Sequence, residues 1–490
     1  MSTINIGSTI PAVCFLVVVY LTGYLAHRRA KEKNFEKEWF TTSRSTTGFA
    51  LAMTFTATYL SASSFVGGPG AAYNFGFGWV LLAATQIPMV LFTLSILGKR
   101  FTMIAERANV VTVVDFLKAR YKNKAVGLIG AFSIVIFFLS AIMAQFIGGA
   151  TIFQTVTGLP YIYGLVFFAV TTLFYVVFGG MRGVTMVDTL FGMMMVAGSL
   201  ALFFVPIIVA GGVGPIINRL AEIDIGLLSP YGSGNALNPL WVSSYFVLVC
   251  FATIGLPHVS IHGLVYKDTK SLHQGIIIGT VITGWLLISL HTAGVFARYF
   301  LPDIPRSDLA IPMLVMELFP SWLGGIILIS ILAAALGTID TQIIITTGAI
   351  VKDIAFGLGL GLTPKNIRRW VYLVSGLIVT ITALLTINPP DLLIWLNLFS
   401  FGGLEATFFL PFVLGLFWKR ANDYGALGSM IAGISSYVIV YSLYGENFFN
   451  LHPIVPSLAI AFLVFVLITL ATPKPSDDII ELFWGEKVKD

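Results

Sequence analysis

Long hydrophobic segments, separated by short polar connections, run through almost the whole chain. A helix needs about 20 apolar residues to cross a membrane, and windows of that length predict about 13 spans. We place them at 8–27, 47–73, 78–98, 125–155, 162–180, 184–211, 241–265, 274–299, 322–351, 370–387, 391–418, 424–444 and 453–472. The segment 309–319 lies between Pro305 and Pro320 and predicts a short amphipathic helix outside the bilayer. The pattern therefore predicts an all-α polytopic membrane protein.

Composition supports this class. Hydrophobic residues make up 57% of the 490 residues and charged residues only 10%, whereas a soluble domain carries about 25% charged residues. The first ten residues lack the basic stretch and cleavage site of a signal peptide, so we expect the first span to be retained. Cys14 and Cys250 lie in apolar segments and indicate neither a metal site nor a disulfide framework.

The basic residues predict the orientation. With the N-terminus outside, all 28 Lys and Arg except Arg219, Arg298 and Arg306 fall on the cytoplasmic side, as the positive-inside rule requires. We therefore expect a multi-pass protein of the cytoplasmic membrane with a cytoplasmic C-terminus, and no nucleic-acid partner. The connections are too short for a soluble catalytic module, and the tail 474–490 is polar, which predicts a flexible segment.

Two spans carry the signs of an interruption. The stretch A-T-Y-L-S-A-S-S-F-V-G-G-P-G-A-A-Y at 57–73 combines hydroxyls with G-G-P-G at 67–70. The stretch F-A-T-I-G-L-P-H-V-S-I-H-G at 251–263 has Gly and Pro in mid-span. Freed backbone groups at membrane depth need a cavity or an ion. A kinked helix packed through small residues is the alternative for either span alone, but paired broken helices favour a transporter with inverted repeats.

The chain resembles the sodium/solute symporter family along nearly its whole length. One family signature matches Gly415, Leu416, Arg420, Gly425, Ala426, Ser429 and Gly433, and another is similar to Phe178–Arg182 leading to Asp188 and Thr189. Within the family, the stretch 57–73, G-L-P-H, F-G-G-L-E-A and H-P-I-V-P-S-L are most similar to the sodium/pantothenate symporter branch.

This resemblance implies a leucine-transporter-type core of five plus five helices in inverted repeats. The chain then divides into a first helix and basic loop (1–46), a first repeat (47–211), an extracellular loop (212–240), a second repeat (241–418), two peripheral helices (419–473) and a cytoplasmic tail (474–490).

The resemblance also implies a sodium site. Matched by position, it takes the carbonyls of Ala57, Leu60 and Ala334 and two side chains at positions 337 and 338. Unwound carbonyls and hydroxyls are suitable sodium ligands. This chain keeps Thr338, but Gly337 stands where the family has Ser.

Three acidic residues fall inside predicted spans, where a carboxylate is costly and usually faces a cavity or a partner. Asp188 matches a family position near the ion pathway. For Asp340 we hypothesise that it compensates for the missing hydroxyl or makes proton coupling feasible, the alternative being a neutral, locally bonded side chain. Glu405 is either a gate element or a partner of a nearby backbone amide.

The substrate site is expected between the two broken helices, where free amides at half-helix N-termini suit an anionic group. Pantothenate, with one carboxylate, would suit such a site. The candidate contacts are polar residues within spans: Ser63, Ser64, Gln86, Gln145, Thr253 and His258. Gln145 has the alternative of an interhelical hydrogen bond, and His258 that of a structural residue. Tyr59 and Phe65 are candidates for the wall.

These expectations combine into an alternating-access symporter that imports pantothenate with sodium, without an organic cofactor or an obligate protein partner. The alternatives are another cargo (proline, a sugar or another carboxylate), proton coupling, or a membrane sensor that does not transport. The motifs of intramembrane enzymes, such as H-E-x-x-H or G-x-S-x-G, are absent from the sequence, so we do not expect an enzyme.

Overall fold

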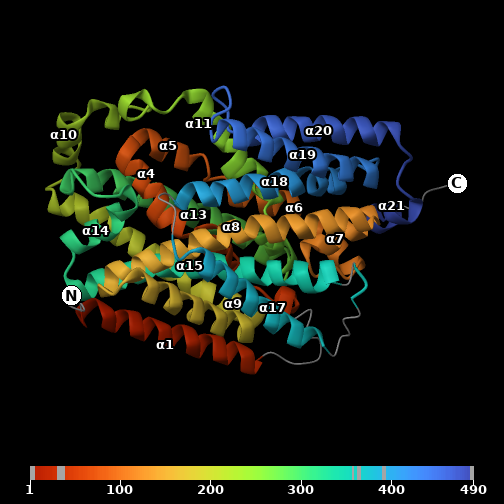
Figure 1. Ribbon diagram of the computed structural model, residues 1–490, viewed down its shortest axis with the longest axis horizontal. Coiled ribbons are helices and arrows are strands. Elements are labelled where there is room, and N and C mark those ends of the chain that lie inside the picture. The colour runs from red at the N-terminus through yellow and green to blue at the C-terminus, as the bar shows by residue number, and fades with distance from the viewer. Residues whose placement is uncertain (1–5, 30–38, 356–357, 361–365, 389–392, 486–490) are drawn as a thin grey trace.

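The helices lie side by side along one direction, as in a membrane-spanning bundle (Figure 1). The computed structural model describes residues 6–29, 39–355, 358–360, 366–388 and 393–485, and within these ranges every regular element is a helix. The short helix α10 (Val213–Ile223) lies at one end of the bundle and α7 (Val113–Tyr121) near the other. We call these the α10 end and the α7 end.

The long helices follow the predicted spans closely, except that the span predicted at 78–98 is divided between α5 (Phe77–Ala84) and α6 (Met89–Arg107), which continues beyond it. They are α1 (Ile6–Arg29), α6 (Met89–Arg107), α8 (Lys124–Thr157), α9 (Tyr161–Val209), α13 (Thr269–Phe300), α15 (Ser321–Gly348) with η10 (Ala349–Ile354), α17 (Ile367–Leu385), α18 (Leu393–Phe417), α19 (Asp423–Tyr444) and α20 (Ile454–Ala471). In the described part, nine helices are long and apolar enough to cross a membrane, or up to 11 if two bent pairs are included. Two shorter apolar helices, Val13–Thr22 and Tyr161–Val176, fall within further predicted spans. The number 13 and the domain boundaries remain predictions, and residues 391 and 392 of one predicted span lie outside the described residues.

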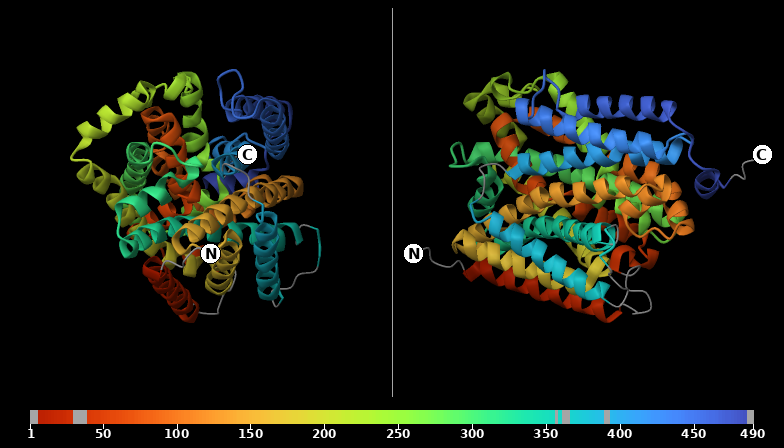
Figure 2. Two further views of the ribbon diagram at one scale, coloured as in Figure 1. Left: turned by 60° about the vertical axis from the view of Figure 1, so that its left-hand side comes forward. Right: turned by 45° about the vertical axis from the view of Figure 1, so that its right-hand side comes forward.

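Burial separates a central group of helices from a peripheral one. The most apolar windows of the spans Ser321–Ile354 and Ile394–Phe417 are each 83% buried, whereas those of α19 and α20 are 28% and 33% buried. Helices α19 and α20 pack against each other along the margin of the bundle (Figure 2). α15 and α18 therefore form the core against which the broken helices pack.

The first broken span lies where it is predicted, but the helix is interrupted at a different residue than predicted. Helices α3 (Gly48–Tyr59) and η3 (Ser63–Gly67), which continues into α4 (Gly68–Phe75), are bent by 69°. The chain leaves the helix at Leu60 (φ −79°, ψ 107°), several residues before G-G-P-G, which is itself helical. The prediction that G-G-P-G makes the break is wrong. Pro69 sits in the first turn of α4, where a missing N–H costs little.

The glycines of G-G-P-G serve close packing instead. A Cβ on Gly68 would lie 2.3 Å from His291 Nε2, and one on Gly70 would lie 2.7 Å from the Ser307 carbonyl oxygen. Neither position has room for a side chain, so α4 packs closely on its neighbours.

The second broken span behaves as predicted. α11 (Pro239–Phe246), η6 (Val247–Phe251) and η7 (Ala252–Gly255) precede the break, and α12 (Pro257–Ser260) and η8 (Ile261–Leu264) follow it at a bend of 55°. Leu256 is extended (φ −82°, ψ 113°) because a residue before proline is disfavoured in the helical region.

α9 contains two predicted spans joined without a loop. Gly180 interrupts it with φ 51° and ψ −163°, a conformation that favours glycine. The Trp39 ring would also clash with a Cβ there, at 2.5 Å. The interruption separates the predicted spans 162–180 and 184–211.

Two short helices outside the spans complete the fold. α14 (Ala310–Leu318) confirms the helix predicted at 309–319, and its Ile311, Leu314 and Val315 are buried. The tail is not simply flexible as predicted, since Asp477–Trp484 form helix α21, which packs against α6 and α7.

Candidate cation and substrate sites

Three backbone carbonyls converge on one hydroxyl between the first broken helix and α15. Thr338 Oγ1 lies 3.3 Å from the Ala57 oxygen, 3.4 Å from the Leu60 oxygen and 3.2 Å from the Ala334 oxygen. A hydroxyl has a single proton and can donate to only one of them. Four oxygens thus surround one buried point, an arrangement that a cation would satisfy better than the hydroxyl proton alone.

Gly337 is closely packed beside this point. A Cβ there would lie 3.0 Å from the Ala57 oxygen and 3.1 Å from Asp188 Oδ1. A serine at 337 would therefore require the carbonyl and the carboxylate to shift by a few tenths of an ångström. Asp188, rather than Asp340, is the acid that lies next to this position.

Asp188 and Asp340 lie beside each other, fully buried. Thr54 Oγ1 donates to Asp188 Oδ2 at 2.8 Å. The Tyr175 hydroxyl lies 3.2 Å from Asp340 Oδ2 and 2.8 Å from the Leu336 carbonyl oxygen. Two ionised carboxylates in contact repel each other, and burial strengthens the repulsion. The pair needs a shared proton or a bound cation.

A cavity lies on the other side of the same break. Its volume is about 50 Å³, and it is lined by Tyr59, Ser61, Ser63, Ser64, Gly68, Trp79, Leu82, Gln86, Tyr245, Val249, His291, Ile394, Asn397, Leu398 and Phe401. The residues come from both broken spans and from α5 (Phe77–Ala84), α13 and α18. The cavity therefore touches the elements that an inverted-repeat transporter would move.

Three of the six predicted substrate contacts line this cavity. Ser63 Oγ is buried without a hydrogen-bond partner among the described residues. Ser64 Oγ lies 3.4 Å from the Ser61 amide nitrogen, and Gln86 Oε1 accepts from the Tyr59 hydroxyl at 2.8 Å. Tyr59 lies in the wall as expected, whereas Phe65 does not.

The other three predicted contacts lie outside the lining. Gln145 Oε1 accepts from the Ala62 amide at 3.0 Å, an interhelical bond that holds the break. Thr253 donates to the Cys250 oxygen at 2.5 Å. His258 is fully buried between the rings of Phe138 and Phe401.

The amides at the first break already have partners. The Ala62 amide is held by Gln145, the Ser63 amide donates to Ser61 Oγ at 3.2 Å and the Ser64 amide to the Ser61 oxygen at 2.9 Å. The expectation that these amides are free for an anion is wrong. Side chains such as Ser63 remain available for a polar substrate.

Ser61, Tyr245, His291 and Asn397 also line the cavity and were not among the predicted contacts. His291 Nδ1 lies 2.6 Å from the Leu287 oxygen, which can only accept, so the neutral ring leaves Nε2 as an acceptor. Asn397 Oδ1 lies 3.5 Å from Gln145 Nε2. Both are polar residues inside predicted spans, which is the same criterion that identified Gln145 as a candidate contact.

Glu405 lies on α18, fully buried, and neither carboxylate oxygen has a hydrogen-bond partner in the described part of the chain. It does not line the cavity. The structure thus offers no backbone amide as its partner, and its role as a gate element remains a prediction.

Two ion pairs join α7 to η10 at the α7 end. Lys118 Nζ lies 2.6 Å from Asp353 Oδ1, and Lys352 Nζ lies 2.6 Å from Asp115 Oδ2. Asp115 also belongs to the capping box of α7 with Thr112. These ion pairs hold α7 and η10 together near the α7 end of the bundle.

Comparisons with known proteins agree with this arrangement. The sequence profile of the sodium:solute symporter family matches residues 39–433. The sodium/pantothenate symporter of Haemophilus influenzae is 41% identical over 469 residues, which cover 94% of this chain and 96% of that protein. The sodium/pantothenate symporter of Escherichia coli is 42% identical over 467 residues, covering 94% and 95%.

A solved structure shows the same fold. The substrate-bound outward-open state of a Na⁺-coupled sialic acid symporter superposes with a TM-score of 0.78 at 17% identity, covering 96% of this chain and 99% of that one. This likeness confirms the predicted leucine-transporter-type architecture. The relatives are transporters, so this chain is not an enzyme. The chain belongs to the sodium:solute symporter family.

Proposed function

We propose that this protein imports pantothenate by sodium-coupled symport through alternating access. The observation that carries the proposal is the break at Leu60. On one side of the break, the carbonyl oxygens of Ala57 and Leu60 lie within 3.4 Å of the Thr338 hydroxyl. On the other side, Ser61, Ser63 and Ser64 line a cavity. A cation held by α3 and α15 would order the segment that contacts the substrate. The names of the two relatives over 40% identical support pantothenate as the cargo.

The cavity offers the chemistry that pantothenate requires. Ser63, Gln86, His291 and Asn397 present hydroxyl, amide and imidazole groups, which match the cargo's carboxylate, amide and hydroxyls. Tyr59 and Trp79 add apolar walls. Such a mixture of apolar surface and a few polar groups is typical of small-molecule sites.

The charge distribution supports inward transport. Arg219, Arg298 and Arg306 belong to the α10 end, while the ion-paired Lys118 and Lys352 belong to the α7 end. By the positive-inside rule the α10 end faces outward and the α7 end faces the cytoplasm, which places the N-terminus outside in the cytoplasmic membrane. The cavity would then load from outside while the α7–η10 ion pairs close the cytoplasmic exit.

Proton coupling is the second candidate, and the carboxyl pair favours it. Asp188 and Asp340 require a proton or a cation as long as they lie in contact. Release of that charge when α15 moves relative to α9 would couple a proton instead of, or together with, sodium.

Uptake of labelled pantothenate into proteoliposomes tests both candidates. A sodium gradient and a proton gradient are imposed separately on wild type, Asp188→Asn and Asp340→Asn. We expect accumulation driven by sodium, with its sodium dependence strongly weakened in Asp188→Asn. If accumulation were driven only by protons and abolished in Asp340→Asn, the carboxyl pair would be the coupling site. No accumulation under either gradient would reject pantothenate as the cargo.

A further inference from the structure

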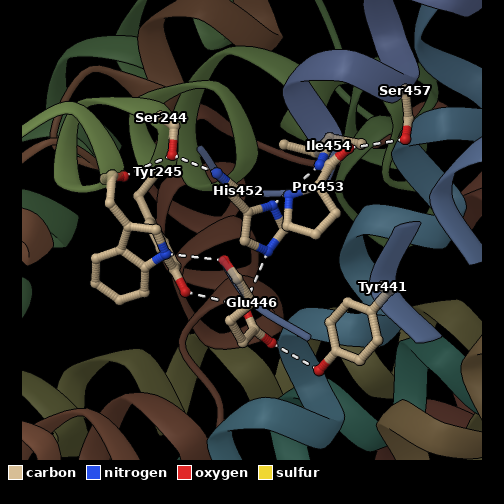
Figure 3. A network of polar contacts seen from close by, with 9 residues as sticks. Ser244, Tyr245, Tyr441, Glu446, His452, Pro453, Ile454 and Ser457 are labelled. Carbon is tan, nitrogen blue, oxygen red and sulfur yellow. Dashed lines mark hydrogen bonds and ion pairs between the residues drawn. The ribbon is translucent and has the colours of Figure 1, made fainter. Parts of the chain in front are cut away.

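The loop between α19 and α20 is tied to the second broken helix by a buried acid (Figure 3). It is a tight hairpin in which Phe448 and Leu451 exchange backbone hydrogen bonds at 2.8 and 2.9 Å. Glu446 lies at the start of this hairpin, and its side chain is 16% exposed. A carboxylate this buried needs partners.

Three groups surround the Glu446 carboxylate. The Tyr441 hydroxyl donates to Oε1 at 2.7 Å and the Tyr245 hydroxyl to Oε2 at 3.0 Å. His452 Nε2 lies 3.0 Å from Oε2. His452 Nδ1 accepts the Ile454 amide at 3.2 Å, whereas Nε2 makes no hydrogen bond within the part of the chain that the structure describes. The carboxylate thus accepts two hydroxyl hydrogen bonds and lies beside the His452 ring.

Two further hydrogen bonds fix the backbone of the hairpin to α11. Trp241 Nε1 donates to the Glu446 carbonyl oxygen at 2.8 Å, and the His452 amide donates to Ser244 Oγ at 2.8 Å. Together with the Tyr245 hydroxyl, these two hydrogen bonds hold one turn of α11. The ring of Tyr245 also packs on that of His452, with centroids 5.1 Å apart.

Tyr245 connects this network to the cavity. It is fully buried, and it lines the cavity from α11, the half of the second broken span that precedes the break. Helices α19 and α20 lie outside the two predicted repeats. The contacts therefore run from peripheral helices directly to a wall of the substrate cavity.

We propose that Glu446 is a positioning residue for substrate binding: it holds Tyr245 and α11 against the cavity from outside the repeats. The identity of the cargo rests on the proposed function, but the anchoring of α11 does not. Glu446→Gln keeps the volume but presents an amide NH₂ in place of one acceptor oxygen, so the Tyr245 and Tyr441 hydroxyls can no longer each donate to an oxygen of its own.

Transport kinetics provide the first test. We expect Glu446→Gln and Tyr245→Phe each to raise the KM for pantothenate about 5- to 20-fold, with the maximal rate within about twofold of wild type. The double variant should be no worse than the more affected single variant, because both changes remove the same interaction. Glu222→Gln is the control. It removes an exposed Glu paired with Arg219 on α10 and should retain the wild-type KM.

The second test does not depend on the cargo. Cys250 is buried on η6, shortly after α11, and Cys14 is exposed. In a Cys14→Ala background, Glu446→Gln should raise the labelling rate of Cys250 by a membrane-permeant maleimide at least about threefold, since α11 is released. Glu222→Gln should leave this rate unchanged.

The outcomes separate the two proposals. No pantothenate uptake by wild type would reject the cargo, and the Cys250 labelling would still decide on the anchor. Unchanged KM and unchanged labelling in Glu446→Gln would overturn the anchor, as would additive effects of Glu446→Gln and Tyr245→Phe.

Discussion

Thr338 shows how one side chain defines the candidate cation site. Its hydroxyl lies among the carbonyls of Ala57, Leu60 and Ala334, and the resemblance to the family named these four positions in advance. It did not reveal that Asp188 lies next to Gly337, because that proximity depends on how α9 packs on α3 and α15. Describing this site therefore requires both the family motif and the packing of the helices.

Asp308 gives a prediction about stability and pH. It lies in η9 (Ser307–Leu309), is 2% exposed, and its Oδ2 is 3.5 Å from Arg306 Nη2. Burial raises the pKa of Asp308 to about 6, and Arg306 offsets this only in part. The folded state therefore holds the proton more tightly than the unfolded state, so the free energy of unfolding falls as the pH rises from about 4 through about 6.

Asp308→Asn should remove the free-energy cost of ionising this buried carboxyl group. We expect stabilisation on the order of 1–3 kcal/mol at pH 7.5 and little change near pH 4, measured by thermal unfolding in detergent. Asp224 is a control of opposite sign, because hydrogen bonds from Ser233 and the Gly226 amide lower its pKa. Asp224→Asn should not stabilise the protein at pH 7.5. A gain from Asp308→Asn that is equal at both pH values would contradict the explanation.

At the scale of elements, helices were predicted well wherever hydrophobic length alone decides them. The second break was placed correctly because Pro257 dictates the backbone of Leu256. The first was misplaced because the glycines at 67, 68 and 70 serve contacts with distant residues such as His291. Such contacts leave no local signal. For the same reason the predicted substrate residues divide evenly between the cavity lining and the surrounding packing.

Helix α21 was not predicted because a buried cation on another element stabilises it. Arg120 is fully buried, donates from Nε to the Gly415 oxygen at 2.7 Å, and its guanidinium lies 5.4 and 5.3 Å from the ring centroids of Phe483 and Trp484. The segment Asp477–Trp484, whose Ile479 and Phe483 are buried, is supported in its helix by this contact, which the local sequence does not show.

Arg120→Lys should therefore destabilise both the fold and the tail. We expect a loss on the order of 2–4 kcal/mol, because lysine cannot reproduce the planar fork and leaves carbonyls unpaired. Thermal unfolding and limited proteolysis of the tail measure it. Lys122→Ala, which removes an exposed ion pair with Asp478, should cost less than about 1 kcal/mol. Equal losses in the two variants would show that Arg120 does not anchor α21.

For the whole molecule, α7, which carries two of the ion-paired residues, lies near the end of the bundle opposite α10 (Figure 1). Lys118 on α7 and Asp353 on η10 are in contact, so transport through alternating access requires these elements to separate. We predict that a bis-maleimide linking Lys118→Cys to Asp353→Cys, with Cys14 and Cys250 replaced by Ala, abolishes uptake but leaves pantothenate binding intact.

The two single-cysteine variants treated with the same reagent are the controls and should continue to transport. Full uptake by the cross-linked protein would mean that α7 and η10 move together and do not form the exit.

The most direct test of the account is the sodium dependence of pantothenate uptake in Thr338→Ser and Thr338→Val. Serine keeps the hydroxyl among the three carbonyls, so its half-saturating sodium concentration should stay within about threefold of wild type. Valine keeps the shape but removes the oxygen, and we expect an increase of at least about tenfold, the equivalent of about 1.4 kcal/mol. If Thr338→Val retained the wild-type sodium dependence, the cation would not be bound at this break, and the proposed coupling would be wrong.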